Sequence, residues 1–293
     1  MNSTYTVTTD SPQKFVVESQ LAYVLWMQGR AFAGFEAEFE VKTILAGDGS
    51  KVKATCRTAK GKKLAVVEGG LILNRFRGKV LIPDSVKPDD YIYLETELSK
   101  LGLRGESNLI PVRASLQVSE MSWSKKEIRR EEEVHLKCIF VNGVEEGDRV
   151  TVLIFEYDPD GCHDLVVKIP AEVEDGKVEL DWRFDYQGHT GSIPTETERN
   201  KYEKSYTRPE YFFVVAVENV HAGKNQESGL LTFIDGVRLF YCDGNNQPVP
   251  NASYTLKFAD GTTREGKLDG DGRAVVDDVP PGKVEVEFSK DDE

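Results

Sequence analysis

The chain has few of the residues and segments that mark several common protein classes. Its 293 residues include only four cysteines, four histidines and three methionines. No two cysteines form a C-x-x-C pair, so we expect reduced thiols of a cytosolic protein and no disulfide framework. The longest early apolar run, 21–27, is far shorter than the roughly 20 residues that a membrane span requires. Residues 1–15 lack the basic region and apolar core of a secretory signal peptide.

Familiar catalytic motifs are also missing from the sequence. It contains no G-x-S-x-G, no H-E-x-x-H and no G-x-x-x-x-G-K-[ST]. The segment 158–164 (DPDGCHD) offers Cys162 and His163 as metal ligands, but adjacent side chains of an extended chain point apart, and its composition favours a turn. The segment 269–273 (DGDGR) begins like a calcium loop, yet its fifth position is an arginine and its twelfth a proline. We therefore predict no catalytic residue, no metal and no cofactor.

Charge is unevenly distributed along the chain. The net charge is −13 overall, made up of +3 for residues 1–114, −10 for residues 115–234 and −6 for residues 235–293. Such an acidic protein is a poor nucleic-acid ligand, because phosphate contacts need clustered positive charge.

The N-terminal third nevertheless carries a basic stretch. It consists of Arg57, Lys60, Lys62, Lys63, Arg75, Arg77 and Lys79. These side chains would make one patch if 51–58 and 76–82 lay in the same sheet. A run of charged residues is more often an ordinary solvent-exposed face than a binding site. The functional alternative is a surface that docks to an acidic protein.

Period-two alternation predicts an all-β fold. In 35–45 (FEAEFEVKTIL) the apolar residues alternate with charged ones, which is typical of a half-buried strand. Turn signals at Asp48-Gly49 and Gly61 separate it from further strands predicted at 51–58, 64–68, 71–73, 76–82 and 91–98. This spacing indicates an immunoglobulin-like β-sandwich over residues 1–114.

A second immunoglobulin-like sandwich is predicted over residues 115–234. A first strand around Trp123 is followed by strands predicted at 133–140, 150–157, 165–169, 178–184, 211–217 and 230–233. Residues 150–157 are apolar on both faces, which indicates a central strand. The polar stretch 187–209 has no period, so we expect a long loop that is functional or disordered. We find no internal repeat at a fixed short period.

The last domain, 235–293, is predicted to be a small antiparallel β-module. Strands at 254–258 and 284–288 alternate strictly, and turns rich in Asp, Gly and Pro lie between them. The two-residue linker Asp235-Gly236 predicts that this module packs against the preceding sandwich.

The module resembles transthyretin-like, or carboxypeptidase-regulatory-like, domains. The residues that carry the resemblance are Tyr254-Thr-Leu, Ala259-Asp-Gly-Thr, Arg264-Glu-Gly, Asp271-Gly-Arg and Val279-Pro-Pro-Gly-Lys-Val-Glu-Val-Glu-Phe. Such modules accompany accessory proteins and effectors of bacterial type VI secretion. The segments 76–83 (FRGKVLIP) and 100–112 (KLGLRGESNLIPV) are similar to a domain found beside type VI spike proteins.

The resemblance implies a non-enzymatic structural or adaptor protein. Its partners would be type VI spike, tube or effector proteins, bound through the basic stretch. It would reside in the bacterial cytoplasm and be exported, if at all, by the contractile apparatus. Two other functions stay open: a secreted hydrolase of cell-wall or lipid substrates with 187–209 as a lid, and a cell-surface adhesin. The sequence does not predict an oligomeric state.

Overall fold

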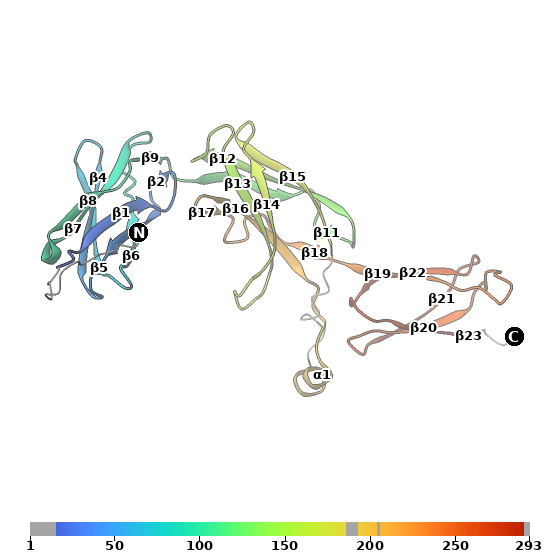
Figure 1. Ribbon diagram of the computed structural model, residues 1–293. Coiled ribbons are helices and arrows are strands. Elements are labelled where there is room, and N and C mark those ends of the chain that lie inside the picture. Colours follow the sequence, from blue (N-terminus) through green and yellow to red (C-terminus); the bar gives the residue numbers. More distant parts are fainter. Residues whose placement is uncertain (1–15, 186–192, 204–205, 290–293) are drawn as a thin grey trace, which may run out of the picture. The chain divides into compact units, whose positions relative to one another are not determined.

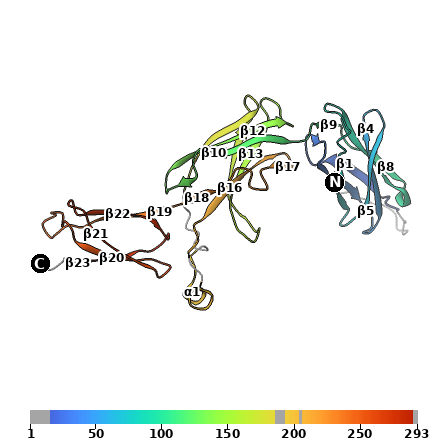
Figure 2. The same ribbon diagram turned by 180° about the vertical axis from the view of Figure 1, so that it is seen from behind.

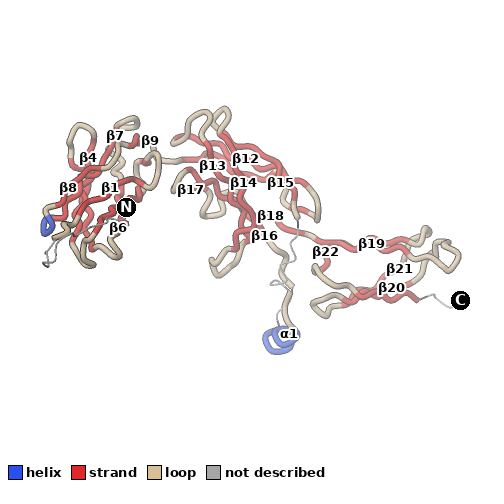
Figure 3. The backbone as a smooth tube through the Cα atoms, viewed as in Figure 1, coloured by secondary structure: helices blue, strands red, loops and turns tan. Residues whose placement is uncertain are grey.

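The computed structural model describes residues 16–185, 193–203 and 206–289. The regular secondary structure of the described chain is almost entirely strand, as predicted (Figure 1; Figure 3). It divides into two compact units: residues up to Leu116 with 218–220, and the remainder. The first unit holds one sandwich, and the second holds another sandwich and the C-terminal module.

The first sandwich has a smaller and a larger sheet. The smaller sheet has the order β1 (Gln20–Trp26), β3 (Glu36–Ile44) and β6 (Arg75–Leu81). The larger has the order β2 (Ala31–Phe32), β9 (Ile110–Arg113), β7 (Tyr91–Leu98), β4 (Lys51–Thr58) and β5 (Lys63–Gly70). A short helix η1 (Ser99–Leu101) follows β7 and leads into β8 (Leu103–Glu106), which is labelled in Figure 2. β8 pairs with β7.

The core of this sandwich comes from inward side chains of both sheets. Phe39 of β3 lies edge-to-face against Trp26 and Phe76, with ring centroids 6.1 and 5.8 Å apart. Cys56 and Leu94 of the larger sheet are fully buried in the same cluster. Each large apolar side chain removed from water in this way contributes roughly 1.5–3 kcal/mol.

The predicted strand 71–73 is wrong, because these residues form a tight turn between β5 and β6. Ile72 and Arg75 exchange backbone hydrogen bonds, and Leu73 and Asn74 between them have φ values of 50° and 61°. Two consecutive left-handed residues make a type I′ turn, which matches the twist of the strands that it joins. The apolar run Leu71-Ile-Leu resembles a strand in sequence, but only Leu71 is buried.

The second sandwich confirms the predicted central strand. Its smaller sheet has the order β10 (Gln117–Trp123), β12 (Glu133–Asn142) and β15 (Lys177–Arg183). The larger has the order β11 (Glu127–Ile128), β18 (Leu231–Phe233), β16 (Glu210–Val217), β13 (Arg149–Glu156) and β14 (Asp164–Glu172). β17 (Val220–Ala222) pairs with β16. β13 therefore has a neighbour on each side.

The two sandwiches are structural repeats of each other. Both have the same strand order. In both, the short second strand pairs in parallel with the last strand of the sandwich, β2 with β9 and β11 with β18. The first strand of each has a one-residue bulge, at Ala22 and Ser119, and ends in a tryptophan, Trp26 and Trp123. Both pairs are 97 positions apart. The sequence has no short-period repeat because the repeated unit is a whole domain.

The sequence predicts a long loop over 187–209, but part of this stretch is helical. Helix α1 (Glu196–Tyr202) occupies part of it, and residues 186–192 and 204–205 lie outside the described residues. Thr195 starts the helix with a capping box: its side chain accepts from the Glu198 N–H, and the Glu198 carboxylate accepts from the Thr195 N–H. This Thr-x-x-Glu signal is present in the sequence and was missed.

The C-terminal module has two sheets, and the predicted strands are present. β19 (Asp235–Phe240) pairs with β22 (Arg273–Val279). The second sheet has the order β21 (Thr263–Lys267), β20 (Ser253–Lys257) and β23 (Glu285–Ser289). Leu256 and Leu239 are buried between the two sheets, where the Tyr241 and Phe288 rings stack 4.5 Å apart. The likeness to transthyretin stays a prediction.

Candidate functional site

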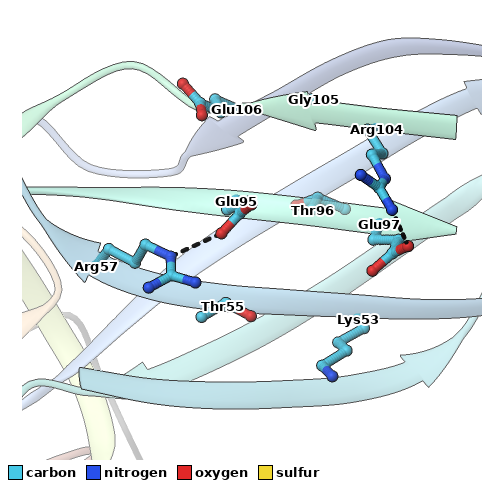
Figure 4. Close-up of a pocket in the computed structure, with 9 residues that line it drawn as sticks. All are labelled: Lys53, Thr55, Arg57, Glu95, Thr96, Glu97, Arg104, Gly105 and Glu106. Carbon is cyan, nitrogen blue, oxygen red and sulfur yellow. Dashed lines mark hydrogen bonds and ion pairs between the residues drawn. The ribbon is translucent and has the colours of Figure 1, made fainter. Parts of the chain in front are cut away.

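The outward face of the larger sheet in the first sandwich forms a charged groove. Side chains that point away from the core on β4, β7 and β8 line a depression of about 480 Å³ (Figure 4). Because side chains alternate along a strand, the charged residues that line it lie two or four positions apart on each of these strands. The lining residues are Lys53, Thr55, Arg57, Glu95, Thr96, Glu97, Arg104, Gly105 and Glu106.

Two ion pairs span neighbouring strands of this groove. Arg57 Nε lies 2.7 Å from Glu95 Oε2, and Arg104 Nη2 lies 2.9 Å from Glu97 Oε1 (Figure 4). Arg57 Nη1 also donates to the Gly61 carbonyl at 3.1 Å. These side chains are partly exposed, so each pair adds little stability. They do fix the positions of the charges.

The Arg104 pair determines what Glu97 can do chemically. The hydrogen bond from Arg104, followed by its charge, holds the pKa of Glu97 below the ordinary value for glutamate. Such a carboxylate is ionised at neutral pH and cannot act as a general acid there. The groove therefore suits electrostatic recognition better than proton transfer.

Two charges of the groove are left over after this pairing. Among the described residues, neither Lys53 nor Glu106 has an ion-pair partner. Lys53 and Glu97 also line a second depression of about 530 Å³, which continues the groove to Gly49 and Lys100. The first depression thus holds two fixed ion pairs together with Lys53 and Glu106, which have no ion-pair partner among the described residues.

The predicted basic stretch is not one patch, because its members lie in two different sheets. Arg57 belongs to β4, Lys63 to β5, and Lys60 and Lys62 to the turn between them. The remaining three, Arg75, Arg77 and Lys79, lie on β6 of the smaller sheet. The condition that 51–58 and 76–82 share a sheet is not met.

Most basic side chains on β6 are engaged within their own sheet. Arg77 Nε lies 2.7 Å from Glu40 Oε2, and Lys79 Nζ lies 2.8 Å from Glu38 Oε1, both across the β3–β6 pairing. The Tyr23 hydroxyl also donates to Glu40, at 2.6 Å. The Tyr23 and Arg77 hydrogen bonds lower the pKa of Glu40, which is 4% exposed. These residues stabilise a sheet face, so they are poor candidates for partner binding.

Three lysines of the prediction stay available at the β4–β5 turn. Lys60 is 88% exposed and 3.9 Å from Asp90, which is a loose pair. Lys62 and Lys63 are exposed as well. They adjoin Arg57, so this corner extends the positive side of the groove. Sequence reasoning missed Lys53, Glu95, Glu97, Arg104 and Glu106. The alternation of charges in 51–57 and 95–97 was the available signal, but it does not show that β8 pairs with β7.

The segment 158–164 forms a turn, with Gly161 at φ 83°. His163 Nδ1 accepts a hydrogen bond from the Asp158 N–H at 3.0 Å, and its ring stacks on Tyr157. Cys162 is exposed, and its N–H donates to Asp160. Within the described residues, no three His, Cys, Asp or Glu side chains gather as a metal site would require.

The comparisons with known proteins assign no family. No family model matches the sequence. Solved structures that match include a tetra-tandem repeat in the extending region of a large adhesion protein, at 12% identity, covering 92% of this chain and 73% of that chain, with a TM-score of 0.26. The ICAM-5 D1–D4 ectodomain fragment matches at 10% identity, over 92% and 75%, with a TM-score of 0.31.

A third match is trypsin-activated alpha-2-macroglobulin from Escherichia coli, at 8% identity, over 94% of this chain and 23% of that chain, with a TM-score of 0.28. Such low identities and TM-scores transfer no function to this chain. In the part of the chain that the structure describes, no helix has the length and apolar character of a membrane span.

Proposed function

We propose that this protein is a non-enzymatic structural or adaptor protein that binds other proteins through the charged groove of its first sandwich. The observation that carries the proposal is the arrangement of the groove, in which Arg57–Glu95 and Arg104–Glu97 fix four charges while Lys53 and Glu106 stay unpaired. Charges held in place steer association and set its register more than they add raw affinity.

The proposed partners are spike, tube or effector proteins of a bacterial type VI secretion system. This part rests on the resemblance of the module, and of 76–83 and 100–112, to proteins of that system. The location is then the bacterial cytoplasm, with export by the contractile apparatus as the route out. Two sandwich repeats followed by a third β-domain suit a protein that carries separate binding surfaces on one chain.

Affinity purification of the full chain from its native bacterium tests the proposal. We expect spike, tube or effector proteins to co-purify with the wild type. The double variant Lys53→Glu/Glu106→Lys reverses both unpaired charges without altering net charge, and should reduce their recovery severalfold. Lys224→Glu, on an exposed loop of the second unit, is the control and should retain them.

Two results would count against the proposal, each in a different way. Absence of every secretion component from the wild-type eluate would reject the type VI assignment. Equal recovery by the double variant and the wild type would reject the groove as the binding surface.

A further inference from the structure

Two turns at one end of the first sandwich expose aliphatic side chains. Ile44 ends β3 and Leu45 follows it, and they are 39% and 56% exposed. Ile72 and Leu73 in the β5–β6 turn are 70% and 76% exposed. The first strand begins at the same end, since Gln20 pairs with Ile44. We call these four residues the apolar tip. Contiguous exposed apolar surface of this kind marks protein or membrane interaction sites.

Hydrogen bonds lock the two turns of the apolar tip together. Asn74 Oδ1 accepts from the Ala46 N–H at 2.8 Å, and Asp48 Oδ1 accepts from the Leu73 N–H at 2.8 Å. The Leu45 carbonyl accepts from the Ser19 hydroxyl at 2.7 Å. The tip is therefore a preformed surface whose polar groups are largely used internally.

The fold itself does not require apolar residues at this turn. Leu45 and Leu73 hold left-handed φ values of 57° and 50°, which disfavour leucine. The equivalent turn of the second sandwich has the same backbone pairing, between Glu174 and Lys177, with Asp175-Gly176 at its centre. Asp-Gly is the ordinary choice for such a turn. Leu73, at the position that Asp175 occupies in the second sandwich, thus carries a conformational cost without a folding benefit.

Cationic side chains flank the apolar tip on both sheets. Arg75 follows the turn and lies opposite Lys42 on the smaller sheet. On the larger sheet, Lys51 and Lys100 line the depression that includes Gly49, together with Glu68 and Glu97. Two copies meeting tip to tip would bring the Arg75 and Lys42 side chains of both copies together, which argues against self-association. An anionic surface fits them instead.

We propose that the apolar tip inserts among the head groups of an anionic lipid bilayer. In a bilayer, backbone polar groups must be satisfied within the protein, and the Leu45 carbonyl and the Leu73 N–H are satisfied in this way. A protein interface would instead be expected to offer free hydrogen-bonding groups and aromatic anchors, which the four tip side chains lack. Burial of aliphatic side chains and attraction of cations to anionic lipids act together in such binding.

This inference goes beyond the proposed function and does not depend on it. The test is sedimentation of the full chain with vesicles of phosphatidylcholine alone, or of equal parts phosphatidylcholine and phosphatidylglycerol. We expect binding to the anionic vesicles, weakening in high salt. Arg75→Gln/Lys100→Gln should lower the partition coefficient about fivefold for each charge removed. Ile72→Thr/Leu73→Asn, which leaves the charge unchanged, should lower it more than tenfold.

The controls separate membrane binding from misfolding. Leu109→Asn changes another exposed leucine, 54% exposed, away from the tip, leaves the charge unchanged and should bind as the wild type does. The Ile72→Thr/Leu73→Asn variant should melt no lower than the wild type, since asparagine tolerates the left-handed turn better than leucine. A wild type that stays in the supernatant with anionic vesicles overturns the proposal. The proposal is also overturned if the wild type, in the absence of vesicles, retains protein partners that the Ile72→Thr/Leu73→Asn variant loses. The tip would then dock to protein.

Discussion

Arg208 and Asp278 are joined by two parallel hydrogen bonds, from Nε and Nη2 of the guanidinium to the two carboxylate oxygens, at 2.7 and 2.5 Å. Arg208 precedes β16 of the second sandwich, and Asp278 lies in β22 of the module. A further hydrogen bond joins the same two domains, from Arg129 Nη1 to Asp277 Oδ1 at 2.6 Å. These two contacts join residues of the second sandwich and of the module, and the packing predicted from the short Asp235-Gly236 linker stays a prediction.

The first prediction concerns the contribution of the Arg208–Asp278 pair to stability. Asp278→Asn keeps a residue type that tolerates the φ of 59° at this position but removes the charge. Both side chains are 43% exposed, so the expected loss in the free energy of unfolding is only about 0.5–1 kcal/mol at pH 7. Urea denaturation measures it, and Asp271→Asn, an exposed turn residue, is the control.

The pH dependence of this loss has a definite sign. The hydrogen bond from Arg208 lowers the pKa of Asp278 in the folded protein. Its stabilisation is thus complete above the unfolded value of about 3.9 and is lost as pH falls through the folded pKa. Wild type and Asp278→Asn should differ equally at pH 6 and 8 and converge in acid. A difference that grows on acidification contradicts this account.

The sequence predicted the strands well and the site poorly, for a physical reason. Alternation along 35–45 reports burial on one face, and β3 shows it directly in buried Phe39 and exposed Glu36. Which strands become neighbours depends on contacts between distant segments. Arg77 was grouped with Arg57 because both are basic and near in sequence, but the chain crosses to the other sheet between them.

The same limit explains the missed groove and the misjudged turn. Arg104 meets Glu97 only because β8 folds back on β7, which no local pattern encodes. Ile72 and Leu73 appeared to belong to a strand because their apolar character normally signals burial. They are exposed, and a conflict of this kind between local pattern and fold is expected at functional positions.

The second prediction concerns the order in which the cysteines react. Burial raises the pKa of Cys56 and of Cys138 to about 12, whereas Cys162 is exposed. The thiolate is the reactive form, so iodoacetamide at pH 8 should alkylate Cys162 first and the half-buried Cys242 more slowly. Peptide mass spectrometry checks the order.

Cys56 and Cys138 should react only after denaturation, each reporting on its own sandwich. Cys162→Ser should remove the fast phase and leave the others unchanged. Native alkylation of Cys138 at a rate near that of Cys162 would show that the second sandwich opens, against its buried position in the structure.

The third prediction uses two neighbouring glycines at the end of β5. A Cβ at Gly69 would lie 2.2 Å from the Phe76 ring, whereas at Gly70 the nearest atom is 3.5 Å away. Overpacking typically costs about 1–3 kcal/mol. Gly69→Ala should therefore lower the free energy of unfolding by that amount, and Gly70→Ala should change it by less than about 0.5 kcal/mol. Equal effects from the two variants in urea denaturation would refute the close packing of β5 on Phe76.

The last prediction concerns the three lysines at the β4–β5 turn. If they extend the positive side of the groove, reversing Lys60, Lys62 and Lys63 to glutamate should slow association with a purified partner and leave the dissociation rate nearly unchanged. The wild-type rate should fall in about 0.5 M salt, where the Debye length is only a few ångströms. Because these side chains are exposed, the free energy of unfolding should change by less than about 0.5 kcal/mol.

A matched control distinguishes local attraction from a change in overall charge. Reversal of Lys168, Lys224 and Lys257 in the second unit alters the net charge by the same amount. Association that slows equally in both triple variants would mean that net charge alone governs encounter. If association slows in neither triple variant, the β4–β5 turn is an ordinary solvent-exposed surface and does not take part in the encounter. Slowing confined to Lys60, Lys62 and Lys63 would place the encounter at the groove, because fields from more distant charges are screened within about one Debye length.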